Sequence, residues 1–388
     1  MAHSRTRHLL KQLLKRKSLW PILGVLGARQ TGKSTLLRDQ LAPKLAAHYI
    51  TLDRHENLEE ANRAPGLFLS THGDAKYPLI IDEVQKAPVL FDSLKANVDE
   101  HRRPGRYYIS GSTEFSKRTG IRESLTGRIG LTHLYPFTIG ELYERGSIFP
   151  WIKLAPSRTT LTEVKLWLDR GGMPGACFLR SEEERNAYFE SYLDTICFRD
   201  LPQIQGAKLS GKLALEILFA LAVLSRPTLS EITSRIRVDS RKIKLHLEAL
   251  AALFIIHPLS PHPRGVGKER YLIFDAGIAA FLNAPLSRRL EIFCLNECLA
   301  QHEYSGLGRP RLYYYESAKH SHLDLIIERR NQTIALALSE DESPGAYYEK
   351  TVRAFLKRIP KAKVFVLAPV KFQHEAANYQ IVPWSYFS

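Results

Sequence analysis

Short apolar runs alternate with amphipathic segments along the first third of the chain. Residues 22–26 are apolar throughout, which is typical of a strand buried on both faces of a parallel sheet. Residues 34–41 follow after a polar loop and predict a helix. Three more strands are predicted at residues 47–53, 77–83 and 106–113. This succession predicts an α/β fold built on a parallel sheet.

The chain begins with a basic segment in which leucines recur at helical spacing. Leu9, Leu10, Leu13 and Leu14 predict an amphipathic helix that packs beside strand 22–26 with its basic face in solvent. Residues 1–38 contain no acidic residue, which would also fit a transit peptide or a polybasic arm. We favour the packed helix.

The pattern over residues 213–275 predicts three helices followed by a two-stranded hairpin, the order of a winged helix-turn-helix. A capping-box sequence at residues 228–231 opens the second helix. The third starts at residues 239–240, and Ile243, Leu245, Leu247, Leu250 and Leu253 are expected on its buried side. Residues 254–256 and 270–274 flank a Pro/Gly-containing hairpin loop.

Basic residues gather on this predicted winged helix. The candidate nucleic-acid-binding residues are Arg237, Arg241, Lys242, Lys244, Arg264 and Lys268. A basic third helix can contact phosphates or enter the major groove of double-stranded DNA. The alternative is that the winged helix packs against protein and its basic face is merely solvated.

Between strand 22–26 and helix 34–41 lies a full match to the phosphate-binding pattern G-x-x-x-x-G-K-[ST]. In such a loop, glycines let backbone N–H groups face phosphate, the lysine reaches the β- and γ-phosphates, and the hydroxyl binds Mg²⁺. Lys33 and Ser34 take the last two roles. The predicted nucleotide-binding residues are Gly27, Ala28, Arg29, Gln30, Thr31, Gly32, Lys33, Ser34 and Thr35.

Catalytic candidates follow the later strands. Strand 77–83 ends in Asp82 and Glu83, which predicts that Asp82 helps Ser34 hold Mg²⁺ and that Glu83 polarises the attacking water. Ser112 ends the next strand and is a candidate contact to the γ-phosphate or the water; the alternative is a turn or helix cap. Arg128 is a candidate arginine finger, acting in cis or from a neighbouring subunit of a homo-oligomer.

Composition narrows the class of protein. A length of 388 residues predicts two to four domains, and a net charge of +15 favours an anionic partner. Cys177, Cys197, Cys294 and Cys298 lack paired spacing and are expected to be buried thiols. The longest apolar run, residues 213–224, is shorter than the roughly twenty residues that a membrane span needs. We therefore expect no membrane partner and a cytoplasmic location.

The motifs at residues 27–34, 80–85, 111–112, 124–128 and 135–142 occur in the order seen in a large prokaryotic family of AAA-like P-loop ATPases, within the AAA+ superfamily. The chain resembles this family over nearly its whole length. The resemblance implies ATP and Mg²⁺ as cofactors and an ASCE-type parallel sheet. It further implies an ATPase domain at 1–145, a helical lid at 146–206, a winged helix at 207–285 and a restriction-endonuclease-like α/β domain at 286–388.

The resemblance also bears on the lid. Gly171-Gly172-Met173-Pro174 is similar to the family's G-G-x-P segment. In related signalling ATPases a G-x-P turn packs on the nucleotide base, which implies that role for Gly172 and Pro174. A plain turn between helices is the alternative. Arg199-Asp200 matches an Arg-Asp dipeptide that either senses nucleotide or joins helices.

The last domain resembles PD-(D/E)-x-K nucleases, which gather acids and a lysine around Mg²⁺. Glu297 and Asp324 fit two of the expected acids. Ala337 and Ser339 stand where Glu and Lys are expected, and neither can supply a carboxylate or a cation. Glu340, Asp341, Glu342 and Lys350 lie nearby and are possible substitutes. We expect a degenerate domain without nuclease activity.

Together these features predict an ATPase that couples nucleotide state to DNA or partner binding through the winged helix. The alternative is a slow nucleotide-dependent switch that recruits a protein partner without binding DNA. An active nuclease is the least favoured interpretation.

Overall fold

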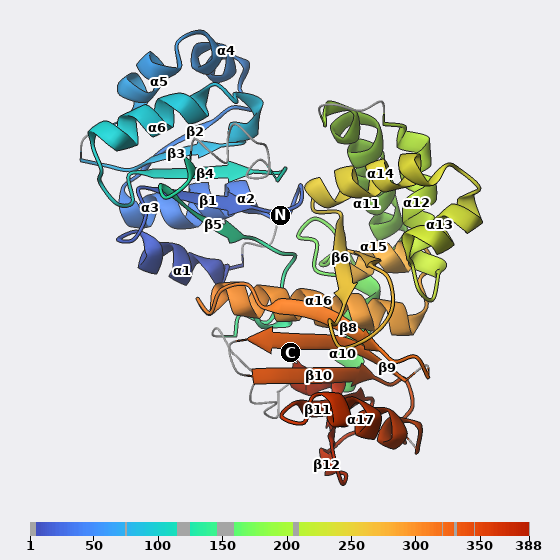
Figure 1. Cartoon of the computed structure of the whole chain (residues 1–388). Coiled ribbons are helices and arrows are strands. Elements are labelled where there is room, and N and C mark those ends of the chain that lie inside the picture. The colour runs from blue at the N-terminus through green and yellow to red at the C-terminus, as the bar shows by residue number, and fades with distance from the viewer. Residues whose placement is uncertain are drawn as a thin grey trace.

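The computed structural model describes residues 5–73, 76–114, 125–145, 159–204, 209–319, 321–329, 332–344 and 346–387. Figure 1 shows an N-terminal α/β part in blue and cyan, a helical part in green and yellow, and a C-terminal part in orange and red. The long helix α16 (Leu286–Tyr304) runs between the α/β part and the C-terminal sheet.

The N-terminal part is built on a five-stranded parallel sheet. Its strand order is β2-β3-β4-β1-β5. Every residue of β1 is buried, as expected of a strand inside a parallel sheet. The α/β fold predicted from the sequence is confirmed here. The strands are β1 (Ile22–Leu26), β2 (His48–Thr51), β3 (Leu79–Asp82), β4 (Tyr107–Gly111) and β5 (Ile129–His133).

Helices surround this sheet. The amphipathic helix predicted at the start is α1 (Leu9–Arg16), whose leucines at positions 9, 10 and 13 are buried. The helix predicted at residues 34–41 begins one residue earlier, passes through a π-helical stretch and continues to Leu45. The others are α4 (His55–Arg63), α5 (Pro65–His72), η2 (Val84–Lys86), α6 (Leu90–Glu100) and α8 (Ile139–Leu142).

The middle of the chain is helical up to a hairpin. The lid region contains α10 (Leu161–Arg170), α11 (Glu182–Asp194), η4 (Thr195–Asp200) and η5 (Leu201–Gln203). The next elements are α12 (Gly211–Val223), α13 (Leu229–Ile236), α14 (Ser240–Ala252), β6 (Ile256–Pro261), β7 (Arg270–Ile273) and α15 (Ala276–Phe281). The capping box at Thr228 and Glu231 forms as predicted.

Two details of this region differ from the sequence prediction. The first hairpin strand runs over Ile256–Pro261 rather than residues 254–256, because Phe254 takes a left-handed conformation (φ 61°) just after α14. Leu245, expected on the buried side of α14, is 40% exposed. The prediction assigned too wide an apolar face to this helix.

An eight-stranded sheet joins the hairpin to the C-terminal part. Its order is β12-β13-β11-β10-β9-β8-β6-β7, and β6 pairs with both β7 and β8. One sheet therefore crosses the predicted boundary at residues 285 and 286. The remaining elements are β8 (Arg311–Glu316), β9 (His322–Arg329), β10 (Gln332–Leu338), α17 (Ala346–Arg358), β11 (Lys363–Ala368), β12 (His374–Glu375), β13 (Gln380–Pro383) and η6 (Trp384–Phe387).

One apolar cluster is shared by the parts, and two further clusters lie within the N-terminal part and the C-terminal part. A single cluster of buried side chains extends from Leu9 in α1, through α16, to Trp384 near the end of the chain. All four cysteines are buried free thiols, as predicted. Among the helices of the described residues, none has the length and apolar character needed to cross a membrane.

Candidate nucleotide site

The loop between β1 and α2 (Lys33–Thr35) needs two of its glycines for steric and conformational reasons. A Cβ on Gly27 would lie 2.3 Å from the carbonyl oxygen of Leu134. Gly32 has φ +93°, a conformation that side-chain-bearing residues rarely adopt. Thr31 closes the loop from inside, since its hydroxyl donates to the carbonyl of Ala28 at 2.9 Å. The loop leads directly into a helix N-terminus, the usual seat of a phosphate.

Lys33 lies inside this loop and is only 4% exposed. Its Nζ donates to the carbonyl oxygens of Gly27 at 3.0 Å and Ala28 at 2.9 Å. Burial lowers the pKa of Lys33, and the nearby carboxylates of Glu83 and Asp82 oppose that shift. The ammonium group is thus held by the loop's own carbonyls within electrostatic reach of the two acids predicted to work with it.

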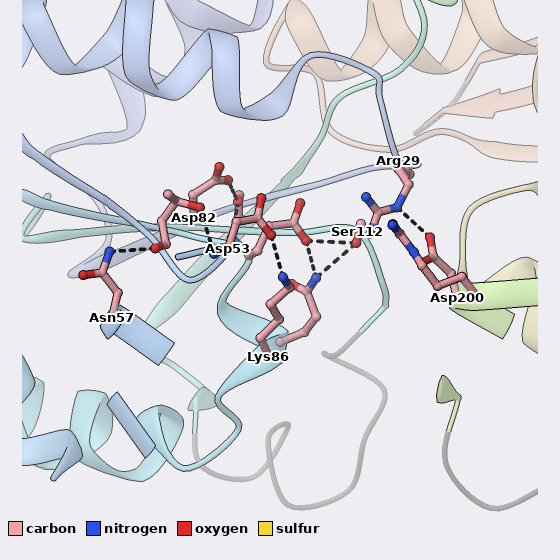
Figure 2. Close-up of polar contacts among 12 residues, drawn as sticks. Arg29, Asp53, Asn57, Asp82, Lys86, Ser112 and Asp200 are labelled. Carbon is pink, nitrogen blue, oxygen red and sulfur yellow. Dashed lines mark hydrogen bonds and ion pairs between the residues drawn. The ribbon is translucent and has the colours of Figure 1, made fainter. Parts of the chain in front are cut away.

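Asp82, the last residue of β3, is fully buried and held by two hydroxyl groups. Ser110 of β4 donates to its Oδ1, and Tyr49 of β2 donates to its Oδ2 at 2.6 Å. The Tyr49 hydroxyl is also hydrogen-bonded to Ser34, and burial is the main cause that raises the pKa of Tyr49. Tyr49 therefore connects the two residues predicted to hold Mg²⁺. Figure 2 shows Asp82 at this edge of the sheet.

Glu83 follows in a left-handed conformation (φ 60°), which turns the chain just after the strand. Its Oε2 accepts hydrogen bonds from the Ser112 hydroxyl at 3.1 Å and from the Gln85 amide. Gln85 also donates to the Ser112 oxygen at 3.0 Å. Ser112 thus lies beside Glu83 at the carboxyl edge of the sheet (Figure 2), where its hydroxyl fixes the orientation of that carboxylate.

The region predicted to be a lid contacts the loop at residues 27–34 directly. Arg29 donates to Asp200 at 2.6 Å, as Figure 2 shows. Tyr188 donates to the Gln30 side chain at 2.5 Å, and Tyr192 donates to the Arg29 carbonyl at 3.4 Å. The Arg-Asp dipeptide singled out in the sequence therefore reaches the loop through its aspartate.

Gly172 and Pro174, the two residues predicted to contact the base of the nucleotide, have different surroundings. A Cβ built on Gly32 would lie 3.9 Å from Cγ of Pro174, so Pro174 is next to the loop. Gly172 is held between two neighbours: its N–H donates to Asp275 at 2.8 Å and its carbonyl accepts from Phe137 at 2.8 Å. Gly172 therefore joins the lid to the segments on either side of it.

Arg128 lies away from these residues. It immediately precedes β5, and its carbonyl accepts from Ile22 at the amino end of β1. Its guanidinium forms a bidentate ion pair with Asp99, at 2.6 and 2.7 Å. The structure thus places Arg128 at the edge of the sheet opposite the phosphate-binding loop. A cis role is not supported by this position, and a role in trans stays a prediction. Ser124 of the same motif lies outside the described residues.

The predicted nucleic-acid-binding residues are all exposed. Arg237, Arg241 and Lys242 cluster around the turn between α13 and α14, whereas Lys244 forms an exposed ion pair with Glu248 at 3.9 Å. Arg264 donates to the Arg358 carbonyl at 2.6 Å and receives a bond from Arg358 at 3.0 Å. Part of Arg264 is therefore committed to joining the hairpin loop to α17, while Lys268 is exposed in the same loop.

The nuclease-like residues are not brought together. Asp324 accepts from the Leu338 amide at 2.7 Å and from His322 at 3.1 Å. Glu297 instead faces the ATPase part and accepts from the Ile139 amide at 2.7 Å. Ala337 is a fully buried residue of β10, and the Ser339 hydroxyl accepts from the Asp341 amide. Within the described ranges no three His, Cys, Asp or Glu side chains form a metal-binding group.

Sequence reasoning missed four residues that organise the site: Arg7, Tyr49, Gln85 and Ser110. Ser110 is a polar residue within an apolar strand, and this is the one sequence feature that could have marked any of the four as functional. The other three act through contacts with residues distant in the sequence or through a turn that only the structure shows.

Comparisons with known proteins agree with the AAA-like domain predicted for the first part of the chain. Residues 20–143 match a family model described as an AAA domain, and residues 161–288 match a domain of unknown function. Two uncharacterized proteins, Mb2031c of Mycobacterium bovis and Rv2008c of Mycobacterium tuberculosis, are each 26% identical over 367 residues, covering 90% of this chain and 76% of the relative.

Two solved structures with detectable similarity come from an archaeon and a bacterium. The Walker-type ATPase PABY2304 of Pyrococcus abyssi is 17% identical, with 73% of this chain and 99% of that chain covered and a TM-score of 0.47. A single-residue variant of RuvB from Thermotoga maritima is 14% identical, with 68% and 88% covered and a TM-score of 0.31.

The phosphate-binding loop, the parallel sheet and the family match define residues 20–143 as an AAA-like P-loop ATPase domain. The remainder of the chain carries no such assignment, since its matched domain has no known function and both full-length mycobacterial relatives are uncharacterized.

Proposed function

We propose that this protein binds ATP with Mg²⁺, hydrolyses it, and uses the nucleotide state to control DNA binding through residues 207–285. One observation carries the proposal: Lys33 and Ser34 of the loop lie next to Asp82 and Glu83. Both carboxylates act on the Lys33 ammonium, and Asp82 shares the Tyr49 hydroxyl with Ser34. These are the residue types that binding and hydrolysis of a nucleoside triphosphate require.

The chain's own residues divide the work. The loop's backbone N–H groups and Lys33 would hold the phosphates, and Ser34 and Asp82 would hold Mg²⁺. When bound, Mg²⁺ would neutralise charge on the β- and γ-phosphate oxygens. Glu83, oriented by Ser112 and Gln85, would accept a proton from the attacking water. Asp82 stays fixed because both its oxygens accept from hydroxyl groups.

The strand order supports an ASCE-type assignment. The loop follows β1 and the two acids follow β3, and β4 lies between those strands. Ser112, at the end of β4, consequently stands between the loop and the acids. This placement favours hydrolysis over simple nucleotide binding, because β4 brings the Ser112 hydroxyl to Glu83, the predicted general base.

The region 207–285 supports the DNA-binding part of the proposal. Three helices and a hairpin follow in winged-helix order, and Thr228 forms an isolated bridge with Arg270 of the hairpin. Exposed Arg237, Arg241 and Lys242 stand at the start of α14, where a recognition helix contacts DNA. The competing function, a switch that recruits a protein partner, remains the second candidate because basic faces can also be solvated.

The C-terminal region is proposed as a structural domain without nuclease activity. Its Ala337 and Ser339 cannot complete a metal site, and Glu297 is already used against the ATPase part. Glu340, Asp341 and Glu342 belong to no metal-binding group within the described residues.

The proposal is tested by measuring ATP hydrolysis of the full chain with Mg²⁺, with and without duplex DNA of random sequence. We expect Mg²⁺-dependent turnover that duplex DNA stimulates. Turnover indifferent to DNA, combined with ATP-dependent capture of a purified partner, would favour the switch. Absence of both nucleotide binding and turnover would reject the proposal.

DNA binding itself should depend steeply on salt. If six to ten phosphates are contacted, affinity should fall by about 10³- to 10⁵-fold between roughly 50 and 200 mM salt. The double variant Arg241→Glu with Lys242→Glu should reduce the salt slope by about two, one for each phosphate contact. Lys95→Glu with Arg102→Glu changes the net charge equally on the exposed surface of the first domain and serves as the control. A flat salt response, or equal losses in both double variants, would contradict a DNA surface at α14.

A further inference from the structure

Arg7 is a buried arginine that precedes α1 and contacts the phosphate-binding loop from behind. It is 3% exposed. Its Nη1 donates to the Thr31 carbonyl at 2.6 Å, and its Nη2 donates to the Tyr135 carbonyl at 2.6 Å. The Nε donates to Glu141 at 3.1 Å, and the guanidinium lies 4.6 Å from the centre of the Phe137 ring. One side chain thus fastens the loop to the segment that follows β5.

The contact with Thr31 fixes the orientation of the peptide group between Thr31 and Gly32, whose N–H is expected to bind phosphate. In a planar trans peptide the carbonyl and the following N–H point in opposite directions. Because the Thr31 carbonyl is directed toward the Arg7 guanidinium, the N–H of Gly32 is directed away from it. Gly32 belongs to the motif whose N–H groups cradle the phosphates. With φ +93°, Gly32 has no side chain to fix its own orientation, so an external anchor matters here.

The chemistry of the site requires arginine. The planar guanidinium serves four acceptors at once, which the compact ammonium of lysine cannot match. They are the carbonyls of Thr31 and Tyr135, the Glu141 carboxylate and the Tyr304 hydroxyl. Glu141 balances the buried charge, and it is itself held, since its Oε1 accepts from the His8 amide at 2.7 Å and its Oε2 accepts from the Thr138 amide at 3.1 Å. The anchor is therefore rigid on both sides of the ion pair.

The same arginine reaches the C-terminal part of the chain. Its Nη2 also donates to the hydroxyl of Tyr304, the last residue of α16, at 3.3 Å. That hydroxyl in turn accepts from the Tyr135 amide at 3.0 Å. The neighbouring Leu134 carbonyl packs against Gly27 at the start of the loop. The loop and the end of α16 are thus joined through Arg7 and residues 134–135.

We propose that Arg7 is a positioning residue for the nucleotide site: it sets the Thr31–Gly32 peptide for phosphate binding and transmits nucleotide occupancy to the end of α16. This role rests on the proposed nucleotide binding and adds to it a coupling between the loop and the C-terminal region.

The test compares Arg7→Lys with Arg16→Lys in the full chain. Arg16 is a matched control, because it also links α1 to α16, through Glu303 at 3.2 Å, but it does not contact the loop. The dissociation constant of ADP with Mg²⁺ and the thermal midpoint of the nucleotide-free protein are measured for each. We expect Arg7→Lys to weaken ADP binding about tenfold or more beyond Arg16→Lys. Arg7→Lys should also lower the thermal midpoint more, because Arg7 is more buried than Arg16 and makes more hydrogen bonds, but the loss of affinity should exceed what this loss of stability accounts for.

If Arg7→Lys does not fold, Tyr304→Phe gives the same answer, since it removes one partner of the guanidinium. Tyr314→Phe is its control, a buried tyrosine whose hydroxyl donates to the Lys268 carbonyl at 2.6 Å. Tyr304→Phe should weaken ADP binding severalfold and Tyr314→Phe should not. Affinity losses that merely follow the losses in thermal midpoint in both pairs would overturn the positioning role. No binding by the wild type would instead reject the proposed function.

The coupling is read by amide hydrogen exchange of α16. ADP should slow exchange near Tyr304 in the wild type and in Arg16→Lys, and much less in Arg7→Lys at saturating ADP. Exchange in α16 that ignores ADP in the wild type would overturn the transmission to α16.

Discussion

Replacing Glu83 with glutamine is expected to lower the rate of ATP hydrolysis by about 10²- to 10⁴-fold, the usual contribution of a positioned general base, while ATP binding is retained. The amide keeps the size of the carboxylate but cannot accept a proton. Ser112 and Gln85 donate to Glu83 Oε2, and the amide oxygen of the variant can still accept from them. Single-turnover hydrolysis and equilibrium ATP binding, measured on the same protein, separate the two effects.

Lys33→Ala provides the contrast. Lys33 is buried in the loop and its ammonium bonds the loop's own carbonyls, so its loss should abolish measurable nucleotide binding. Glu83→Gln with normal turnover would show that another group is the base, and Glu83→Gln without ATP binding would show that the glutamate is structural. Ser112→Ala, which removes one of the two donors to Glu83, should slow turnover by a smaller factor of about ten.

Much of the ATPase fold could be predicted because its signals are local. Apolar strands that end in polar residues mark the carboxyl edge of a parallel sheet and predict Asp82, Glu83 and Ser112, while the phosphate-binding motif predicts Lys33. These residues lie together. The rule requires only strand positions and the knowledge that parallel strands place functional groups at one edge.

Arg128 shows where such local reasoning fails. A basic residue after a glycine says nothing about which end of the sheet it occupies, and the pairing of Ile129 with Ile22 puts Arg128 at the amino edge. Its partner Asp99 lies 29 positions away in the sequence. Arg7 is the opposite case, because it contacts the site although the sequence did not predict it. Its contact with Tyr304 spans 297 positions, and a periodic pattern of apolar residues cannot report such a pairing.

The C-terminal acids lie on the helix and strand expected of them, but the sequence pattern does not report which way they face. Glu297 and Asp324 fit a nuclease motif by their spacing, yet Glu297 points toward α8 rather than toward Asp324. The hairpin likewise cannot be separated from the C-terminal sheet, since β6 pairs with β8. Both facts depend on how α16 packs between two sheets, which is a property of the assembled core.

Glu297 leads to the second large effect, a change of stability with pH. The side chain is 3% exposed, and burial raises its pKa from 4.5 to about 7, against bonds from Ile139 and Gln301 that lower it and with the charge of Glu141 adding to the rise. Between these two pH values the folded state binds a proton that the unfolded state has released. Stability contributed by this group is therefore complete below pH 4.5 and is lost as pH rises toward 7, by about 3 kcal/mol.

Glu297→Gln should remove this loss, because the variant keeps an acceptor for the Ile139 amide and carries no charge, and the Gln301 amide can rotate to present its oxygen. Denaturant unfolding of both proteins from pH 4.5 to 8 gives the difference in stability, in which all other titrating groups cancel. The free energy of unfolding of the variant should equal that of the wild type near pH 4.5 and exceed it by about 3 kcal/mol above pH 7. Asp275→Asn is the informative control. Burial raises the pKa of Asp275 to about 6, but both its oxygens accept from backbone amides, Oδ2 from Gly172 and Oδ1 from Gly277 and Ile278. An introduced NH₂ group must therefore face a backbone N–H in either orientation, so this variant should be less stable than the wild type. A stability difference for Glu297→Gln that does not vary with pH would mean that Glu297 is ionised in the folded protein throughout, and that α16 meets the ATPase part through a solvated carboxylate.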